Sequence, residues 1–554
     1  MQLRNLNKTN GPGPRKSIIM NRREIVKSLS IAPFAGGLML QDELLGNSPS
    51  SPVNSGDDVY RSLGIEPVIN CRGTFTIIGG SIERPEVLKA QEAASGHFVQ
   101  YDELAEGIGK KLAALTKTEW GIVTSGCAGA LKHITAACVT GGNPEKLIRI
   151  PDLTGFEKTQ VIIPSHSRNA YDHAVRNIGV KIITVDTPEE MEKAINPRTA
   201  MIYLMTPSAS ETGQPFSLEV IAEIANPHGI PVLVDAAAED LTIPPVHLKR
   251  GATVVAYSGG KAICGPQCAG LVLGDKNLLM STWQASSPHH GPGRDNKVGK
   301  EEMLGMVAAV EAWTTRDHEN EWKNWLGRLG YISKKVTKIK SVETEVKQPS
   351  GLNNRAPVLV ISWDPTELNI TGYQVAEDCA RKAPRLAIGD NDEDHKASIT
   401  ITPSQMQDGQ EKVVADRLNK LLSEKRPSLS SELKPADVAI SGPWEVDMHF
   451  FTSTSKQSFY LEQEGNWIQG THQGEFAIRD LIGMVEGDEV KFRSQFRIPG
   501  DNITYLYSGK VTGDSMEGTV HLGEYLTAKF TAKRVVYKKN RKPIQIPGGP
   551  PLAT

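Results

Sequence analysis

Between about residues 57 and 325, hydrophobic positions come in short β-branched runs separated by longer amphipathic segments. The runs predict strands and the segments predict helices. The expected strands span residues 121–124, 160–164, 181–185, 200–205, 231–235, 254–257 and 269–273, and the expected helices span 128–140, 170–178, 188–195 and 217–226. Alternation at this spacing is typical of a mostly parallel sheet covered on both faces, with ligands at the carboxyl ends of the strands. We therefore predict an α/β domain over residues 57–325.

The pattern changes twice further along the chain. Residues 326–423 predict a smaller α+β subdomain, with a strand at 357–363 and helices at 372–382 and 410–424. Residues 424–437 are rich in Pro, Ser and charge, which predicts a linker. Residues 438–536 alternate with a period of two between Gly-containing turns, which predicts an all-β antiparallel up-and-down barrel of about eight strands, similar to lipocalins. The basic, Pro/Gly-rich tail at 537–554 predicts disorder.

Composition excludes several classes of protein. With 39% hydrophobic and 23% charged residues, the chain is not intrinsically disordered as a whole. A formal net charge of -2 offers no basic excess for nucleic acid, and no apolar run reaches the 18 residues of a transmembrane helix. Six cysteines do not form a disulfide scaffold, and the pair Cys264 and Cys268 lacks a second ligand pair for zinc. No metal site is expected, because His449, His472 and His521 lie on separate predicted strands without Asp or Cys beside them.

The first 56 residues predict an export signal and a disordered lead. The twin-arginine sequence Arg22-Arg23 precedes a short, weakly apolar segment at 29–40, the pattern of a Tat signal. We expect a mature N-terminus between residues 41 and 57 and an extracytoplasmic location, and either Met1 or Met20 can be the start. The alternative is a basic arm before a short core helix in a cytoplasmic protein.

Candidate chemistry lies at three predicted strand ends in the α/β domain. Residues 124–128 (Thr-Ser-Gly-Cys-Ala) join a strand to a helix, where backbone N–H groups bind phosphate. Asp235 ends an apolar strand, and Lys261 follows another strand after Ser258-Gly-Gly. Taken singly, these are an ordinary turn, a helix cap and a solvated loop lysine. In this order they are what pyridoxal phosphate (PLP) requires: a phosphate cradle, a carboxylate for the ring nitrogen and a lysine for the Schiff base.

The same segments, with several others, resemble fold-type I PLP enzymes, whose fold is that of aspartate aminotransferase. They are most similar to the branch that holds selenocysteine synthase (L-seryl-tRNA(Sec) selenium transferase) and D-glucosaminate-6-phosphate ammonia-lyase. The resemblance rests on residues 67–74, 123–128, 166–176, 234–238, 258–267 and 297–302. It implies that Lys261 forms the Schiff base and that Asp235 pairs with the pyridine nitrogen. It further implies that His166 stacks on the ring and that the phosphate is held by Ser125, Gly126, Cys127 and Ser258.

Charge and the export signal decide between the substrates of this branch. A charged tRNA needs a large basic surface, which this chain lacks, so a selenium transferase is disfavoured. We expect a lyase that carries out α,β-elimination on a small amino acid or amino-sugar acid, with Lys261 as general base. An aminotransferase remains an alternative because the lysine alone does not select the reaction.

The remaining expectations concern substrate contacts and assembly. Arg385, Arg294 and Arg168 are the candidates for binding a substrate carboxylate. The resemblance implies a homodimer or larger assembly. A non-enzyme alternative is an exported binding protein in which the barrel is the working part.

Overall fold

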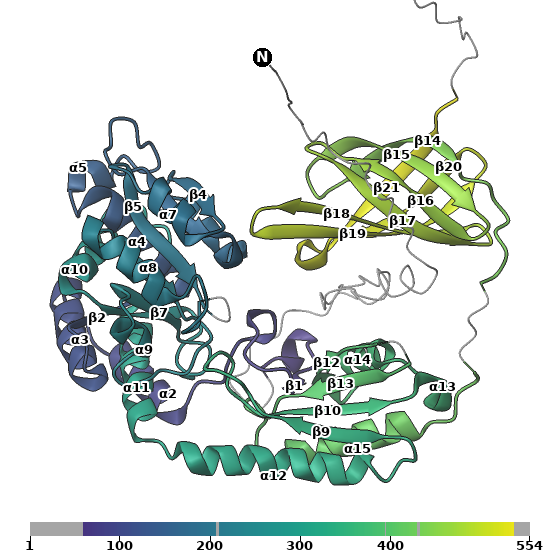
Figure 1. The fold of residues 1–554 in the computed structure, drawn as a ribbon. Helices are drawn as coiled ribbons and strands as arrows, with labels where there is room; N and C mark the ends of the chain where they lie inside the picture. The colour runs from purple at the N-terminus through teal and green to yellow at the C-terminus, as the bar shows by residue number, and fades with distance from the viewer. Residues whose placement is uncertain (1–58, 207–209, 394, 429–432, 537–554) are drawn as a thin grey trace, which may run out of the picture. The chain divides into compact units, whose positions relative to one another are not determined.

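The computed structural model describes residues 59–206, 210–393, 395–428 and 433–536 (Figure 1). These residues divide into two compact units, one α/β and one all-β, with the division close to residue 430. The predicted export signal and C-terminal tail lie outside the described residues. No described helix has the length and hydropathy needed to cross a bilayer.

A seven-stranded sheet in the order β2-β8-β7-β6-β5-β3-β4 forms the centre of the α/β unit. Its strands are β2 (Trp120–Ser125), β3 (Gln160–Pro164), β4 (Lys181–Val185), β5 (Thr199–Met205), β6 (Val232–Asp235), β7 (Val254–Ser258) and β8 (Ala269–Gly274). The five strands from β7 to β4 are parallel, and β8 runs antiparallel to both of its neighbours. Since β2 is antiparallel to β8, β2 points the same way as β7. The carboxyl ends of β2, β6 and β7 therefore share one edge, and the predicted α/β class is confirmed.

Helices cover both faces of this sheet and enclose two hydrophobic cores. One core takes side chains from α2, α3, α8 and α11, and the other takes them from α4, α6 and α10. Adjacent residues of β6 alternate between the cores, with Val232 and Val234 in the first and Leu233 in the second. The helices of this part are α2 (Pro85–Ser95), α3 (Tyr101–Thr116), α4 (Gly126–Thr140), α5 (Pro144–Leu147), α6 (His173–Arg176), α7 (Pro188–Ala194), α8 (Leu218–Ala225), α9 (Val246–Lys249), α10 (Lys276–Gln284) and α11 (Lys300–Thr315).

One predicted helix differs from the structure. Instead of a continuous helix over 170–178, the chain forms a 3₁₀ turn (Ala170–Asp172) followed by the single helical turn α6. The carboxylate of Asp172 is fully buried here and bonds Arg168 and Arg176 on either side. Gly179 ends the segment at a φ of +91°, with no space for a Cβ beside the Pro151 carbonyl.

The long helix α12 (His318–Val336) leads to the smaller subdomain. Figure 1 shows it along the four-stranded antiparallel sheet β12-β13-β10-β9. The elements here are β9 (Glu343–Lys347), β10 (Val358–Trp363), α13 (Pro365–Leu368), α14 (Gly372–Arg381), β12 (Gly389–Asp390), β13 (Ala397–Ile401) and α15 (Gln410–Ser423). A separate parallel pair joins β1 (Val68–Asn70) to β11 (Arg385–Ala387). The strand β1, which precedes the large domain in the chain, therefore pairs with the smaller subdomain.

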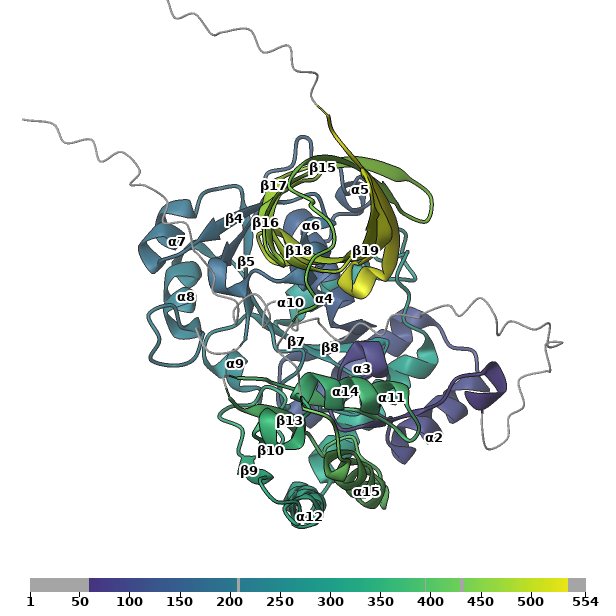
Figure 2. The ribbon, with the colours of Figure 1, turned by 90° about the vertical axis from the view of Figure 1, so that its right-hand side faces the viewer.

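The C-terminal unit is a closed barrel of eight antiparallel strands in chain order, seen nearly end-on in Figure 2. Its strands are β14 (Gly442–His449), β15 (Thr454–Glu464), β16 (Trp467–Gln473), β17 (Ile478–Glu486), β18 (Glu489–Ile498), β19 (Asp501–Thr512), β20 (Ser515–His521) and β21 (Thr527–Arg534). The predicted barrel is confirmed. Of the eight strands, β17 is the one that the sequence pattern did not reveal.

Candidate active site

Asp235 is the buried carboxylate at the end of β6, with 3% of its surface exposed. Its Oδ1 accepts hydrogen bonds from the Ala237 amide at 3.1 Å and from the Cys127 thiol at 3.4 Å. Its Oδ2 accepts one from the Tyr203 hydroxyl at 3.0 Å. Burial raises the pKa of Asp235 above its ordinary value, and the three hydrogen bonds and the charge of Lys261 oppose this rise. A carboxylate oxygen can accept two bonds, so within the described residues Oδ2 keeps room for one more donor.

Lys261 lies three residues beyond the end of β7, on a turn that requires glycine. A Cβ on Gly259 would lie 2.5 Å from the Pro266 carbonyl oxygen, and one on Gly260 would lie 2.7 Å from the Gln267 Cα. The Lys261 Nζ donates to the carbonyl oxygen of Thr74 at 3.0 Å. Burial lowers the pKa of Lys261, while the charge of Asp235 opposes the decrease. The amine is therefore closer to its neutral, nucleophilic form than a solvated lysine.

The third strand end leads into the N-terminus of α4. Gly126 has a φ of +69°, and Gly270 on β8 passes so close that a Cβ there would lie 2.4 Å from the Gly126 carbonyl. Ser125 Oγ accepts a hydrogen bond from Asn296 Nδ2 at 2.6 Å. The first amides of a helix have no partner within the helix and attract anions. This arrangement is suited to a phosphate.

The geometry of these residues fits PLP. The open acceptor position on Asp235 suits a protonated ring nitrogen, the Lys261 amine suits the aldehyde carbon, and the α4 N-terminus suits the phosphate. Ser125, Gly126, Cys127 and Ser258 stay the residues predicted to hold the phosphate. The buried thiol of Cys127 itself donates to Asp235, so its contribution at the α4 end comes from its backbone amide.

Comparison with known proteins supports this interpretation. Residues 103–315 match the family of Cys/Met metabolism PLP-dependent enzymes. A D-glucosaminate-6-phosphate ammonia lyase from Salmonella typhimurium is 27% identical over 383 residues, covering 66% of this chain and 98% of the relative. A 5'-C-glycyluridine monooxygenase-decarboxylase from a Streptomyces species is 26% identical over 379 residues, 66% of this chain and 92% of the relative. A solved structure of D-glucosaminate-6-phosphate ammonia-lyase aligns with a TM-score of 0.59 and 25% identity, covering 66% of this chain and 98% of that one.

The chain is a PLP-dependent enzyme of fold type I. It is related to D-glucosaminate-6-phosphate ammonia-lyase, and its class is that of a lyase. The barrel lies beyond the family match, which ends at residue 315.

His166, predicted to stack on the PLP ring, lies in the 3₁₀ turn directly after β3. The residue is exposed in part, its ring meets the Phe216 ring edge-on at 5.6 Å, and the desolvation of the ring lowers its pKa. Ser167 Oγ lies 3.1 Å from His166 Nδ1 and accepts from the Met205 amide at the end of β5. Met205 pairs with Asp235 in the sheet, so His166 lies at the same edge of the sheet as Asp235, with β5 between its own strand β3 and β6.

The three arginines predicted to bind the substrate carboxylate make contacts away from Lys261 and Asp235. Arg385 donates to the carbonyl oxygens of Ala380 at 2.6 Å and Glu66 at 3.1 Å, so its guanidinium fastens the β1–β11 pair. Arg168 forms an ion pair with buried Asp172, and Arg294 is exposed on the loop after α10. The structure brings none of the three into contact with Lys261 or Asp235 among the described residues.

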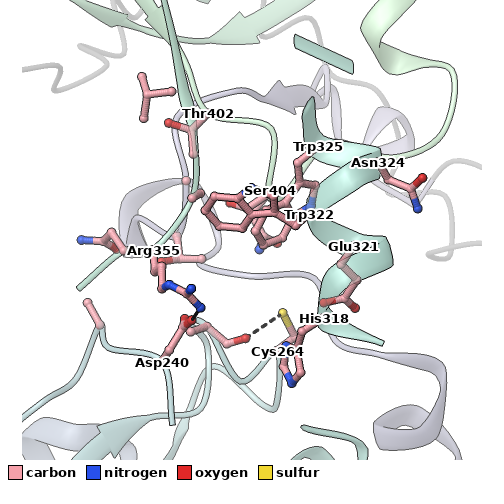
Figure 3. Close-up of a pocket in the computed structure, with 18 of the residues that line it drawn as sticks. Asp240, Cys264, His318, Glu321, Trp322, Asn324, Trp325, Arg355, Thr402 and Ser404 are labelled. Atoms are coloured by element: carbon pink, nitrogen blue, oxygen red, sulfur yellow. Dashed lines mark hydrogen bonds and ion pairs between the residues drawn. The ribbon is translucent and has the colours of Figure 1, made fainter. Parts of the chain in front are cut away.

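A cavity of about 410 Å³ borders the Lys261 turn of the enzyme. Thr74, Ala262 and Cys264 lie along it, and Trp322 and Trp325 of α12 project into it (Figure 3). Its charged lining comprises five arginines and two carboxylates: Arg72, Arg84, Arg316, Arg328, Arg355, Asp240 and Glu321. The cavity wall therefore carries more positive than negative charge.

Ion pairs within the lining fix several of these side chains. Arg355 Nη1 lies 3.4 Å from Asp240, and Glu321 binds Arg84 at 3.0 Å and Arg316 at 3.3 Å. Arg328 pairs with Asp408 outside the cavity lining at 2.7 Å. Arg72 lies over the Phe75 ring at 4.7 Å, and burial lowers its pKa.

Sequence reasoning missed Tyr203, Asn296, Thr74 and the cavity arginines. Tyr203 sits in the middle of an apolar strand and reads as core, although its hydroxyl reaches Asp235. Asn296 directly precedes the segment 297–302 that carries the resemblance, but nothing local links it to Ser125, 171 residues away. The clustering of arginines around α12 depends on tertiary structure and gave no local signal.

Proposed function

We propose that this PLP-dependent enzyme catalyses α,β-elimination on a small anionic amino compound, an amino acid or amino-sugar acid. The observation that carries the proposal is the Lys261 amine, held at a strand end by Thr74 and placed within electrostatic reach of the buried Asp235. The ammonia-lyase activity named for the relative supports the choice of reaction.

PLP supplies an electron sink that makes the proton on the substrate Cα acidic. Asp235, stabilised as an anion by three donors, would keep the ring nitrogen protonated. Lys261 would take the Cα proton, because burial leaves more of its amine neutral than in water. Thr74 would hold the amine in place through its carbonyl oxygen.

The overall reaction balances without a further reactant. A β-hydroxy amino acid would lose the Cα proton and the Cβ hydroxyl as water. The resulting enamine tautomerises, and water then releases ammonia to leave a 2-keto acid. Substrate and the sum of products therefore have the same atoms, with no oxidant or reductant required.

The positively lined cavity supports an anionic substrate. Five arginines against three carboxylates, counting Asp408 on Arg328, favour an acid. The Trp322 and Trp325 rings offer flat faces for an apolar or sugar-like body. In this proposal the cavity arginines take the place of Arg385, whose guanidinium is bound to backbone carbonyls.

The test uses the purified full chain loaded with PLP. Borohydride should bleach the visible absorption band and leave a reduced pyridoxyl group on the peptide that contains Lys261. On loaded enzyme that has not been treated with borohydride, β-hydroxy amino acids and amino-sugar acids should yield ammonia and a 2-keto acid in equal amounts. Lys261→Ala should lose both signals, whereas Lys110→Ala, which removes an exposed lysine paired with Glu106, should keep them. A loaded enzyme that transaminates these substrates without releasing ammonia would refute the elimination.

Two further expectations about this enzyme stay predictions. Tat export rests on the twin arginines at 22 and 23, and an intact mass that begins at Met1 in extracytoplasmic protein would contradict cleavage. A homodimer or larger assembly rests on the resemblance, and sedimentation of the loaded enzyme tests it.

A further inference from the structure

The interior of the barrel contains a polar cluster at one end. We define the Arg479 cluster as the side chains of Gln457, His472, Arg479, Ser494, Tyr505 and Tyr507. Their contacts with one another place these side chains on the inside: His472 bonds Gln457 and Ser494, and its ring meets those of Tyr505 and Tyr507 edge-on. Arg479 lies over the Tyr505 ring at 4.4 Å. The cluster therefore joins residues of five consecutive strands, β15 to β19.

The neutral members of the cluster satisfy one another. His472 is fully buried, with Nε2 at 2.5 Å from Gln457 Oε1 and Nδ1 at 2.8 Å from Ser494 Oγ. Burial, assisted by the charge of Arg479, lowers the pKa of His472 to about 3, so the ring is neutral at physiological pH. With Gln457 Oε1 as an obligate acceptor, Nε2 carries the ring proton and Nδ1 accepts from the Ser494 hydroxyl.

Arg479 and Tyr507 have donors without acceptors. Arg479 Nε and Nη1 and the Tyr507 hydroxyl are buried, and in the described part of the chain none of the three has a hydrogen-bond partner. Tyr507 is only 2% exposed, and burial raises its pKa. Its ring stacks at 6.2 Å on the Tyr505 ring, over which Arg479 lies. Arg479 meets the rings of Tyr505 and Phe496 but no carboxylate among the described residues. Buried donors of this kind are nearly always paired in proteins, so an acceptor from outside the chain is indicated.

The end of the barrel nearest Arg479 is ringed with exposed apolar side chains. Arg479 is the second residue of β17, and the turns before β15, β17 and β21 lie at this same end because adjacent strands are antiparallel. We call the apolar rim the four residues Phe451 (82% exposed), Phe476 (83%), Ile478 (70%) and Leu526 (41%). Beyond Tyr507 the interior is filled by Phe459, Phe492 and Phe530, whose rings lie 5.2 to 6.4 Å from its ring. A ligand held by Arg479 would therefore extend outward past the apolar rim.

We propose that this end of the barrel binds a small amphipathic carboxylic acid, with its carboxylate on Arg479 and Tyr507 and its apolar body against the apolar rim. A carboxylate matches the fork of donors on a guanidinium and also accepts from a phenol. The apolar residues of the rim distinguish this ligand from an inorganic anion. The proposal concerns the barrel alone and does not depend on the reaction at Lys261.

The experiment measures binding to the PLP-loaded full chain by isothermal titration. The probes are straight-chain acids from butanoate to dodecanoate, with octanol as the neutral analogue and sulfate as the anion without a body. We expect an acid of this series to bind at least tenfold more tightly than octanol or sulfate, and to slow hydrogen exchange in peptides of β15 to β19. Octanol binding equal to the best acid, sulfate binding equal to it, or no binding by any acid would each overturn the proposal.

Three variants locate the site. Arg479→Met and Tyr507→Phe should each weaken acid binding, the first by at least tenfold. Lys529→Met removes an exposed cation on β21 near the same end and should leave binding unchanged. Undiminished binding by Arg479→Met would show that Arg479 is not the ligand-binding group.

Discussion

Tyr203→Phe tests how the enzyme keeps Asp235 charged. Tyr203 is fully buried on β5, and its hydroxyl donates to Asp235 Oδ2 at 3.0 Å, the single bond given to that oxygen within the described residues. The substitution removes one oxygen atom and no ring volume. Asn169 Nδ2, which donates to the Tyr203 hydroxyl at 3.1 Å, keeps its other bond to the Ser167 carbonyl. The main change is therefore the loss of one hydrogen bond to the Asp235 carboxylate.

The size of the effect follows from the strength of the lost bond. A hydrogen bond to a charged group contributes about 1.5–3 kcal/mol, which corresponds to about 10- to 150-fold in a dissociation constant. Without this donor the anion is less stable, so the pKa of Asp235, already raised by burial, rises further. We expect PLP to bind about 10- to 150-fold more weakly, and the loss of affinity on acidification to begin at a higher pH than in the unmodified enzyme.

The assay is titration of the apoprotein with PLP, followed by absorption, across a range of pH. Tyr257→Phe is the matched control, because Tyr257 is equally buried on β7, on the other side of β6 from Tyr203, and is not among the three donors to Asp235. A dissociation constant within twofold of the unmodified value, with an unchanged acid limb, would refute the reasoning. An equal loss in Tyr257→Phe would assign the effect to core packing instead.

Three further predictions concern other parts of the chain. Asn296→Ala removes the amide that donates to Ser125, so PLP should bind about 5- to 10-fold more weakly. Pyridoxal, which lacks the phosphate, should bind as before, and equal losses of affinity for both compounds would contradict a role at the phosphate. Gly109→Ala would place a Cβ 2.3 Å from the Trp120 ring and should lower the free energy of unfolding by about 1–3 kcal/mol, whereas Gly107→Ala on the same helix meets nothing within 4 Å and should raise it by about 0.5–1 kcal/mol, both measured by urea denaturation. Burial lowers the pKa of His472 to about 3, whereas the pKa of an unfolded histidine is about 6.5. The free energy of unfolding of the barrel should therefore fall by up to about 1.4 kcal/mol per pH unit as the pH drops from the higher value to the lower one. His472→Gln should abolish this slope, measured by hydrogen exchange of barrel peptides.

The sequence predicted those strands whose side chains follow one rule along their length. The strands at 160–164 and 181–185 coincide with β3 and β4, because they are apolar runs bounded by turns. β17 was missed because its inward positions begin with a charged residue, Arg479, so the alternation of apolar and polar residues fails at its start. The residue that hides the strand is the same one that suggests a ligand.

The active site was predictable where a residue adjoins a strand end. Asp235 and Lys261 carry that signal, and the structure places both at one edge of the sheet. The signal for Arg385 was weaker, because it was only the position of this residue in the smaller subdomain. In the structure its guanidinium binds the carbonyl oxygens of Ala380 and Glu66. Which arginine faces a cavity depends on how α12 packs, and no local pattern encodes that packing.

The pairing of β1 with β11 has a consequence for biosynthesis. Glu66 at the start of this region meets Arg385, a residue 319 positions later. At about 5–20 residues per second, the ribosome needs about 15–65 s to supply the second partner after the first. Meanwhile the segment that follows β1, which carries the Thr74 carbonyl for Lys261, has no strand to anchor its start. The nascent chain can therefore form its central sheet well before the segment that carries Thr74 is anchored beside Lys261. The cofactor site is completed only late in synthesis.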